Sequence, residues 1–219
     1  MGRNYLILAP FLGALSTPDI AWSTPEVVAS APNSENAQDQ TLMAACAKLP
    51  CRKAIRHFSL RSADGNSVEV STTIAPYIND KGAIFIYPGE EIGVALTKQD
   101  EALGQPALAT VTDPNGPVAL EFPHPDAANL TFKFHEMDGK PDMLLTVDNR
   151  IDAVVKYDLV MYVAARDGYR GVRTSACGLM PPQGGQKSFM GFEHWPNPIL
   201  MLAITNIRAL PKGSAISCQ

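Results

Sequence analysis

The sequence contains no run of Lys or Arg residues, and charged residues make up only 18% of its 219 residues. Proteins that bind nucleic acid through phosphate contacts normally carry a basic stripe or patch, whereas the formal net charge here is −4. We therefore expect no nucleic-acid partner. Hydrophobic residues reach 46%, which argues against a disordered chain, because disorder requires low hydrophobicity and high net charge.

Motifs of common enzyme classes are also missing. The chain has no GxSxG elbow of an α/β-hydrolase, and the glycines of PPQGGQKS (181–188) lack the spacing of a phosphate-binding loop. Glu90 and Glu91 are adjacent, so on a strand they point to opposite faces and cannot act on one substrate atom. We expect them to be solvated at a turn. The sequence thus assigns no catalytic residue, no cofactor and no metal ligand, and it leans against an enzyme.

No segment reaches the ~20 consecutive apolar residues that a membrane-spanning helix needs. The apolar stretch from Tyr5 to Leu15 follows one positive charge, Arg3, as in a secretory signal peptide. Small-residue cleavage sites lie after Ser16 and after Ala31. The sequence therefore predicts a periplasmic or secreted protein, although a buried N-terminal strand or helix is the alternative. The expected organisation is a signal peptide (1–31), a flexible mature N-terminus (32–40) and a single domain (41–219).

Cysteine is scarce: Cys46, Cys51, Cys177 and Cys218 are the four in the chain, and none forms a CxxC motif. Without that motif neither a redox-active dithiol nor a zinc knuckle is indicated, whereas structural disulfides fit an exported protein. Of the three possible pairings we favour Cys46–Cys51 and Cys177–Cys218. The second bridge would fasten a chain end that otherwise frays and would stabilise the fold by ~3–4 kcal/mol. Four reduced thiols in a cytoplasmic protein are the alternative.

What the chain does contain is a series of short apolar stretches separated by turn residues. In 153–165 the odd positions are apolar or aromatic and the even positions include Lys156 and Asp158, a period of two that indicates a strand. Residues 198–210 are apolar on both faces, as in a strand covered on two sides. One short helix within 41–50 and about ten strands predict an antiparallel β-sandwich, immunoglobulin-like in the broad sense, with a barrel as the alternative.

An acid, a base and an aromatic ring stand together near the C-terminus as Glu193, His194 and Trp195. They precede Pro196 and Pro198, which hold their neighbours extended and are confined to strand starts and edges. We predict that the tripeptide lies in a loop before the last strand. Trp195 would cover the end of the core, with the acid and the base hydrogen-bonded or solvated beside it. The tripeptide is still the first candidate for a binding site.

The leading functional interpretation is a non-catalytic binding, adhesion or structural module that recognises a protein, a peptide or a glycan. One alternative is a periplasmic copper-binding protein, because His135 and Met137 lie two apart on one strand face and form a soft ligand pair, which His124 or His194 could complete. The other is a hydrolase with a loop-borne site around His194. The chain also has a formal glycosylation sequon that begins at Asn129.

Overall fold

The structure is a computed structural model that describes residues 44–52, 55–62, 64–72, 74–99, 102–112, 125–165, 168–211 and 214. The predicted signal peptide, the predicted flexible N-terminus, His124 and Cys218 lie outside the described residues. Nearly all regular structure within these ranges is strand. The strands in chain order are β1 (His57–Arg61), β2 (Ser67–Ser71), β3 (Ile84–Ile86), β4 (Glu91–Ala95), β5 (Lys98–Gln99), β6 (Ala102–Leu103), β7 (Ala107–Thr112), β8 (Leu130–Glu136), β9 (Met143–Asn149), β10 (Val155–Ala165), β11 (Gly168–Ser175), β12 (Phe189–Trp195) and β13 (Ile199–Ala209), with one 3-10 turn, η1 (Pro125–Ala127).

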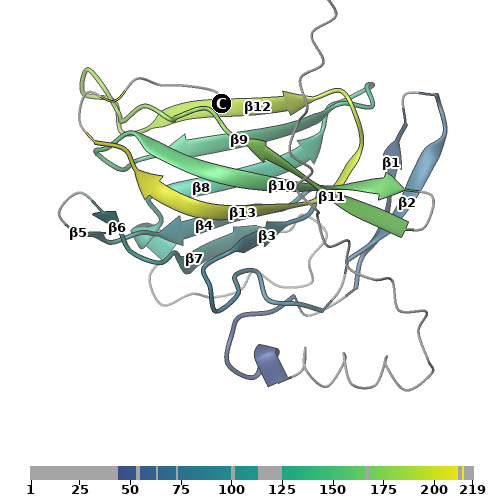
Figure 1. Ribbon diagram of the computed structural model, residues 1–219, viewed down its shortest axis with the longest axis horizontal. Helices are drawn as coiled ribbons and strands as arrows, with labels where there is room; N and C mark the ends of the chain where they lie inside the picture. Colours follow the sequence, from purple (N-terminus) through teal and green to yellow (C-terminus); the bar gives the residue numbers. More distant parts are fainter. Residues whose placement is uncertain are drawn as a thin grey trace, which may run out of the picture.

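Two antiparallel sheets form the body of the molecule (Figure 1). One has four strands in the order β11-β10-β13-β3, and the other has five in the order β12-β9-β8-β4-β7. The predicted antiparallel β-sandwich is confirmed. The last strand, β13, lies between β10 and β3, as expected from its two apolar faces.

The core fills the space between the two sheets. In β9 the buried residues Met143, Leu145 and Val147 alternate with partly exposed ones, which is the period of two that a half-covered strand requires. Phe132 of β8 and Tyr157 of β10 meet edge to face with ring centroids 5.5 Å apart. An aromatic pair of this kind adds about 0.5–1.5 kcal/mol beyond its buried area.

Two small sheets and a short helix extend the sandwich. β1 pairs with β2, and β5 pairs with β6. The helix expected within 41–50 is shorter in the described residues, where it covers 44–46 and then turns. The amides of Lys48 and Leu49 both donate to the carbonyl of Ala45, and Pro50 has no N–H with which to continue a helix.

The stretch that contains Glu193, His194 and Trp195 is a strand, so the predicted loop is wrong. Strand β12 pairs with β9 over seven consecutive residues without a register shift and forms an edge of the five-stranded sheet. Its outward residues include Met190 and Phe192, which are 64% and 73% exposed.

The sequon asparagine is used in folding. The side-chain oxygen of Asn129 accepts a hydrogen bond from the Leu96 amide (2.9 Å), and its side-chain nitrogen donates to the Leu96 carbonyl (2.8 Å). This reciprocal pair resembles one unit of a β-ladder and joins the end of β4 to the start of β8.

Among the described residues, no helix has the length and the apolar character that crossing a membrane requires.

Candidate functional site

A groove of about 1010 Å3 lies between the outer face of the four-stranded sheet and the N-terminal segment of the described chain. Its volume is at the upper end of the range of small-ligand pockets, which is about 300–1,000 Å3. Most of the residues that line it are apolar or aromatic. They are Ala44, Ala45, Lys48, Leu49 and Arg52 from the N-terminal segment; Glu69, Val70, Ser71, Ala75, Pro76, Asn79 and Asp80 from β2 and the stretch after it; and Phe85, Tyr87, Tyr162, Tyr169, Leu200 and Met201 from the sheet and its border.

The floor of the groove follows from the register of the sheet. Tyr157 and Leu159 of β10 point into the core, so Tyr162, at an even position, points outward. Tyr162 lies opposite Met201 of β13, and its ring meets that of Tyr169 with centroids 5.7 Å apart. Tyr169 is 68% exposed, so an aromatic surface is open to a ligand at this end.

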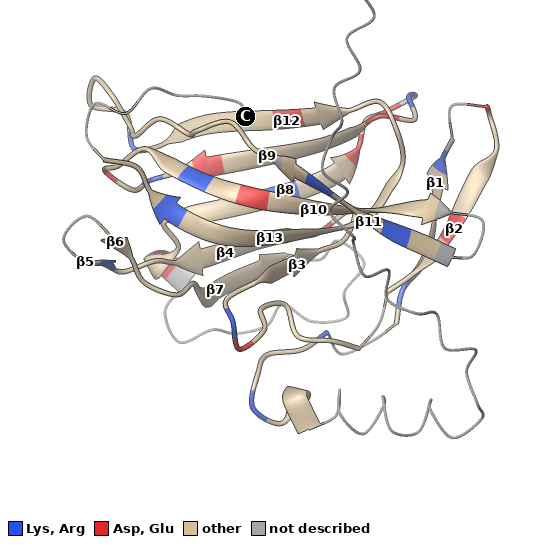
Figure 2. Cartoon of the chain, viewed as in Figure 1, with Lys and Arg blue, Asp and Glu red and all other residues tan. Residues whose placement is uncertain are grey.

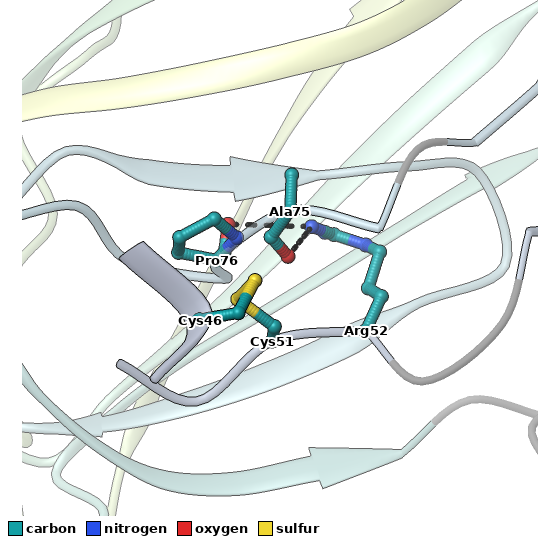
Figure 3. The surroundings of a disulfide bond; sticks show 5 residues. All are labelled: Cys46, Cys51, Arg52, Ala75 and Pro76. Carbon is teal, nitrogen blue, oxygen red and sulfur yellow. Dashed lines mark hydrogen bonds between the residues drawn. A yellow bond between two sulfur atoms is a disulfide. The ribbon is translucent and has the colours of Figure 1, made fainter. Parts of the chain in front are cut away.

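The N-terminal segment that forms one wall contains a disulfide between Cys46 and Cys51, whose Cα atoms are 5.4 Å apart (Figure 3). This bond confirms the predicted pairing. It ties the short helix to residue 51, which forms an isolated bridge with Pro76. Cys177 is also disulfide-bonded, and its predicted partner Cys218 lies outside the described residues.

Arg52, next to the disulfide, anchors this wall to the sandwich. Its guanidinium Nε and Nη2 donate to the two carboxylate oxygens of Glu90 at 2.8 and 2.7 Å. Nη2 also donates to the Phe85 carbonyl at 2.7 Å. The guanidinium carbon lies 4.4 Å from the Tyr77 ring centroid and 4.7 Å from that of Tyr87, an arrangement that favours a planar cation.

Glu90 is therefore not the solvated turn residue that the sequence suggested. Its side chain is 0% exposed, and one carboxylate oxygen also accepts the Tyr87 amide at 2.8 Å. A buried carboxylate is tolerated only when it is paired and hydrogen-bonded. Arg52 supplies the positive charge that pairs with Glu90, and Tyr87, in the turn before β4, supplies the amide that donates to it.

Charged residues of both signs are interspersed along the strands and turns (Figure 2). Three exposed ones line the groove, namely Lys48, Glu69 and Asp80. Since Arg52 and Glu90 neutralise each other, the border of the groove has an excess of negative charge. Its acidic groups and its tyrosine rings both attract cations.

The predicted tripeptide lies in another part of the molecule, and none of its residues lines this groove. The Glu193 carboxylate accepts a hydrogen bond from the Cys177 amide at 2.8 Å. Trp195 packs against the core, and the His194 ring pairs with Asp142 at 3.0 Å. Glu193 and His194, which flank Trp195, are thus both hydrogen-bonded, although the backbone here is a strand and not a loop.

Glu193 also affects the sandwich interior. Burial raises the pKa of the Tyr157 phenol far above its ordinary value, and the negative charge of Glu193 raises it further. Tyr157 therefore stays neutral in the folded protein at any ordinary pH. Its role is to fill the core.

Of the residues of the copper hypothesis, His124 lies outside the described residues, and His135 and His194 lie on strands that are not adjacent. In the part of the chain that the structure describes, no three His, Cys, Asp or Glu side chains lie close enough to hold a metal ion. His135 and His194 both lie opposite Leu144, one on each neighbouring strand, so two strand spacings of about 4.8 Å separate their backbones. Burial, followed by the charge of Lys133, lowers the pKa of His135.

For the hydrolase hypothesis, the partner of His194 among the described residues is an acid and not a nucleophile. Asp142 is the described side chain that hydrogen-bonds the His194 ring, and this ring is 45% exposed on an edge strand. A His–Asp pair alone orients an imidazole, and it needs a hydroxyl, a thiol or a bound water as third member to perform hydrolysis.

The groove was missed by sequence reasoning because its lining comes from three segments that meet only in the folded protein. The sequence held a partial signal in Tyr162 and Tyr169, one in β10 and one in β11. A hairpin can form without such aromatic side chains, so their presence hinted at a binding surface. Comparison of the chain with protein-family models, with curated proteins and with solved structures finds no significant match.

Proposed function

We propose that this protein is an exported, non-catalytic binding module that holds a peptide segment in the groove. The peptide carries apolar side chains together with at least one Lys or Arg. The observation that supports this most directly is a groove of about 1010 Å3 with aromatic residues on its floor and carboxylates on its border.

The apolar part of the ligand follows from the lining. Tyr162, Met201 and Phe85 present rings and a thioether to the groove, and apolar contact with such groups contributes about 25 cal/mol per Å2 removed from water. Methionine adapts its shape to different partners. The floor therefore suits side chains of variable size rather than one rigid molecule.

The positive charge of the proposed ligand follows from the acidic residues at the border of the groove. Glu69 and Asp80 outnumber Lys48 there, and the formal net charge of the chain is −4. A cationic side chain can approach both carboxylates and the exposed face of Tyr169. A negatively charged ligand would meet repulsion at the same positions.

Export is supported by the N-terminal sequence and by the cysteines. The stretch from Tyr5 to Leu15 has the pattern of a secretory signal, and Cys46 and Cys51 form a disulfide. Disulfides form and persist in oxidising compartments such as the periplasm or the extracellular space.

Selection of random heptapeptides displayed on phage, with the oxidised protein as target, tests the proposal. We expect the selected peptides to combine aromatic or aliphatic residues with Lys or Arg. Synthetic copies should then bind Tyr169→Ser about fivefold more weakly and Asp80→Lys about threefold more weakly, as measured by fluorescence anisotropy.

Two matched variants control for loss of an aromatic ring and for charge reversal elsewhere. Phe192→Ser removes an exposed ring on β12, and Asp126→Lys reverses an exposed charge in η1; neither residue lines the groove. Both should bind the peptides within twofold of the unmodified protein. The proposal is wrong if selection enriches no such peptides, or if the groove variants bind them as tightly as the controls do.

A further inference from the structure

The groove runs along the edge of a strand as well as over the face of a sheet. Glu69, Val70 and Ser71 of β2 all line it, although successive side chains of a strand point to opposite faces. Val70 is 6% exposed and points into the core, whereas its two neighbours are exposed. Three consecutive residues can line one cavity only where the cavity meets the backbone edge.

The backbone groups at this edge can be assigned from the hairpin. The amide of Thr72 donates to the carbonyl of Arg56, and the amide of Ser62 donates to the carbonyl of Asn66. In an antiparallel pair, residues that bond to the partner alternate with residues whose N–H and C=O point away from it. The even residues from 66 to 72 therefore point toward β1, and Ser67, Glu69 and Ser71 direct their backbone groups to the other side.

That other side is open in the described part of the chain, where β2 pairs with β1 alone. On the far side of the hairpin, the amide of Arg61 in β1 donates to the side chain of Glu136 at 2.7 Å. The hairpin is thus tied to the sandwich through β1. Its β2 edge is left facing the groove.

The edge of β2 has few of the features that protect an edge against pairing. Natural proteins protect edges with proline, bulges, charged side chains (Lys above all) or very short strands, and the charged residue of β2 is Glu69. β2 pairs with β1 over five residues without a register shift and contains no proline. Two other edges differ, because β3 has only three residues and β7 meets a register shift in its pairing with β4. The edges of β11 and β12 are also unbroken, but no residue of β12 lines the groove and Tyr169 alone does so from β11.

We infer that the peptide ligand binds as an additional β-strand on the free edge of β2. This inference rests on the proposed function and specifies how the ligand is held. The backbone groups of Ser67, Glu69 and Ser71 bind the peptide main chain, which gives affinity without regard to sequence. Alternate peptide side chains pack on the apolar floor, and the intervening ones lie beside Glu69, which selects Lys or Arg.

A pair of substitutions at one position separates the backbone contribution from the charge. Glu69→Ala keeps the N–H and loses the carboxylate, so the selected peptides should bind about threefold more weakly. Glu69→Pro also removes the N–H that faces the groove, and affinity should fall about tenfold further. Proline is tolerated at an edge position whose N–H points away from the neighbouring strand, and protected amides of Val68 and Val70 in hydrogen exchange would verify that the hairpin is intact.

N-methylation of each peptide amide in turn provides the decisive readout. Strand addition uses every second peptide N–H, so methylation should weaken binding about fivefold to tenfold at alternate positions and leave the others unchanged. Exchange of the Glu69 and Ser71 amides should slow when the peptide binds.

Uniform tolerance of N-methylation, or unchanged exchange at Glu69 and Ser71, would show that the peptide is not added as a strand. If Tyr169→Ser still weakened binding in that case, the proposed function would stand without this mode of binding. If Tyr169→Ser had no effect, both the proposed function and the proposed addition of the peptide as a strand would fail.

Discussion

Arg52 and Glu90 form a two-point ion pair although 38 residues separate them in the chain, and their side chains are only 4% and 0% exposed. The pair connects the disulfide-bonded segment to the turn that precedes β4. Through it, the wall of the groove is fixed to the core of the sandwich. The shape of the groove therefore depends on this buried ion pair.

Removal of one partner of this pair should be costly. Glu90→Ala leaves a buried guanidinium without its counter-charge, and we expect a loss of about 3–5 kcal/mol in the free energy of unfolding. The double variant Arg52→Met, Glu90→Leu leaves no buried charge and should lose less than Glu90→Ala alone. Urea denaturation at neutral pH measures all three proteins. A double variant that lost more stability than Glu90→Ala would contradict a coupled pair.

Loss of the first disulfide should have a smaller effect on stability. Cys46 and Cys51 close a short loop, for which chain entropy gives about 2 kcal/mol. The double variant Cys46→Ser, Cys51→Ser should therefore unfold at a lower urea concentration with an unchanged slope. Because Ala45 and Leu49 of this loop line the groove, peptide affinity should fall as well. Unchanged affinity would mean that the ion pair of Arg52 alone holds the wall.

Gly191, in β12, leaves room for the side chain of Leu179. A Cβ atom at this position would lie 2.3 Å from Cδ2 of Leu179, a residue that is only 5% exposed. Gly191→Ala should therefore lower the free energy of unfolding by about 1–3 kcal/mol through overpacking. Combination with Leu179→Ala should cost less than the sum of the two single changes, as a thermal denaturation series would show. Strict additivity would indicate that Leu179 moves aside freely.

His135 should make stability dependent on pH. Its pKa in the folded protein is lowered from 6.5, first by burial and then by Lys133, with Asp138 acting in the opposite direction. The unfolded chain therefore binds this proton more tightly, so the stabilisation is present above pH 6.5 and is lost as the pH falls below it. Between pH 7.5 and 5, the unmodified protein should lose more stability than His135→Gln does. An NMR titration of the His135 ring with a midpoint at or above 6.5 would contradict this.

Strand periodicity made most of the sandwich predictable. Residues 153–165 and 198–210 alternate or stay apolar over long stretches, and they form β10 and the central strand β13. β12 was missed because its inward side carries Gly191 and Glu193 while its outward side carries Met190 and Phe192. Because both faces of β12 mix polar and apolar residues, hydrophobicity gives no signal of period two.

The candidate site was beyond sequence reasoning for a different reason. Glu90 looks like a surface residue until its partner is known, and Arg52 is brought to it by tertiary structure. The groove likewise depends on where the β1–β2 hairpin lies relative to β10 and β13. Such relationships between distant segments leave no local pattern in a single sequence.

The reciprocal hydrogen bonds between Asn129 and Leu96 have a practical consequence for producing this protein. Glycan transfer to a sequon takes place on the asparagine nitrogen, the atom that donates to the Leu96 carbonyl at 2.8 Å. In a eukaryotic secretory pathway, a sugar attached before folding would occupy the place of that contact and would keep β4 and β8 from joining there. A host without N-glycosylation, or an Asn129-preserving Thr131→Val change that cancels the sequon, should therefore give the higher yield of folded material.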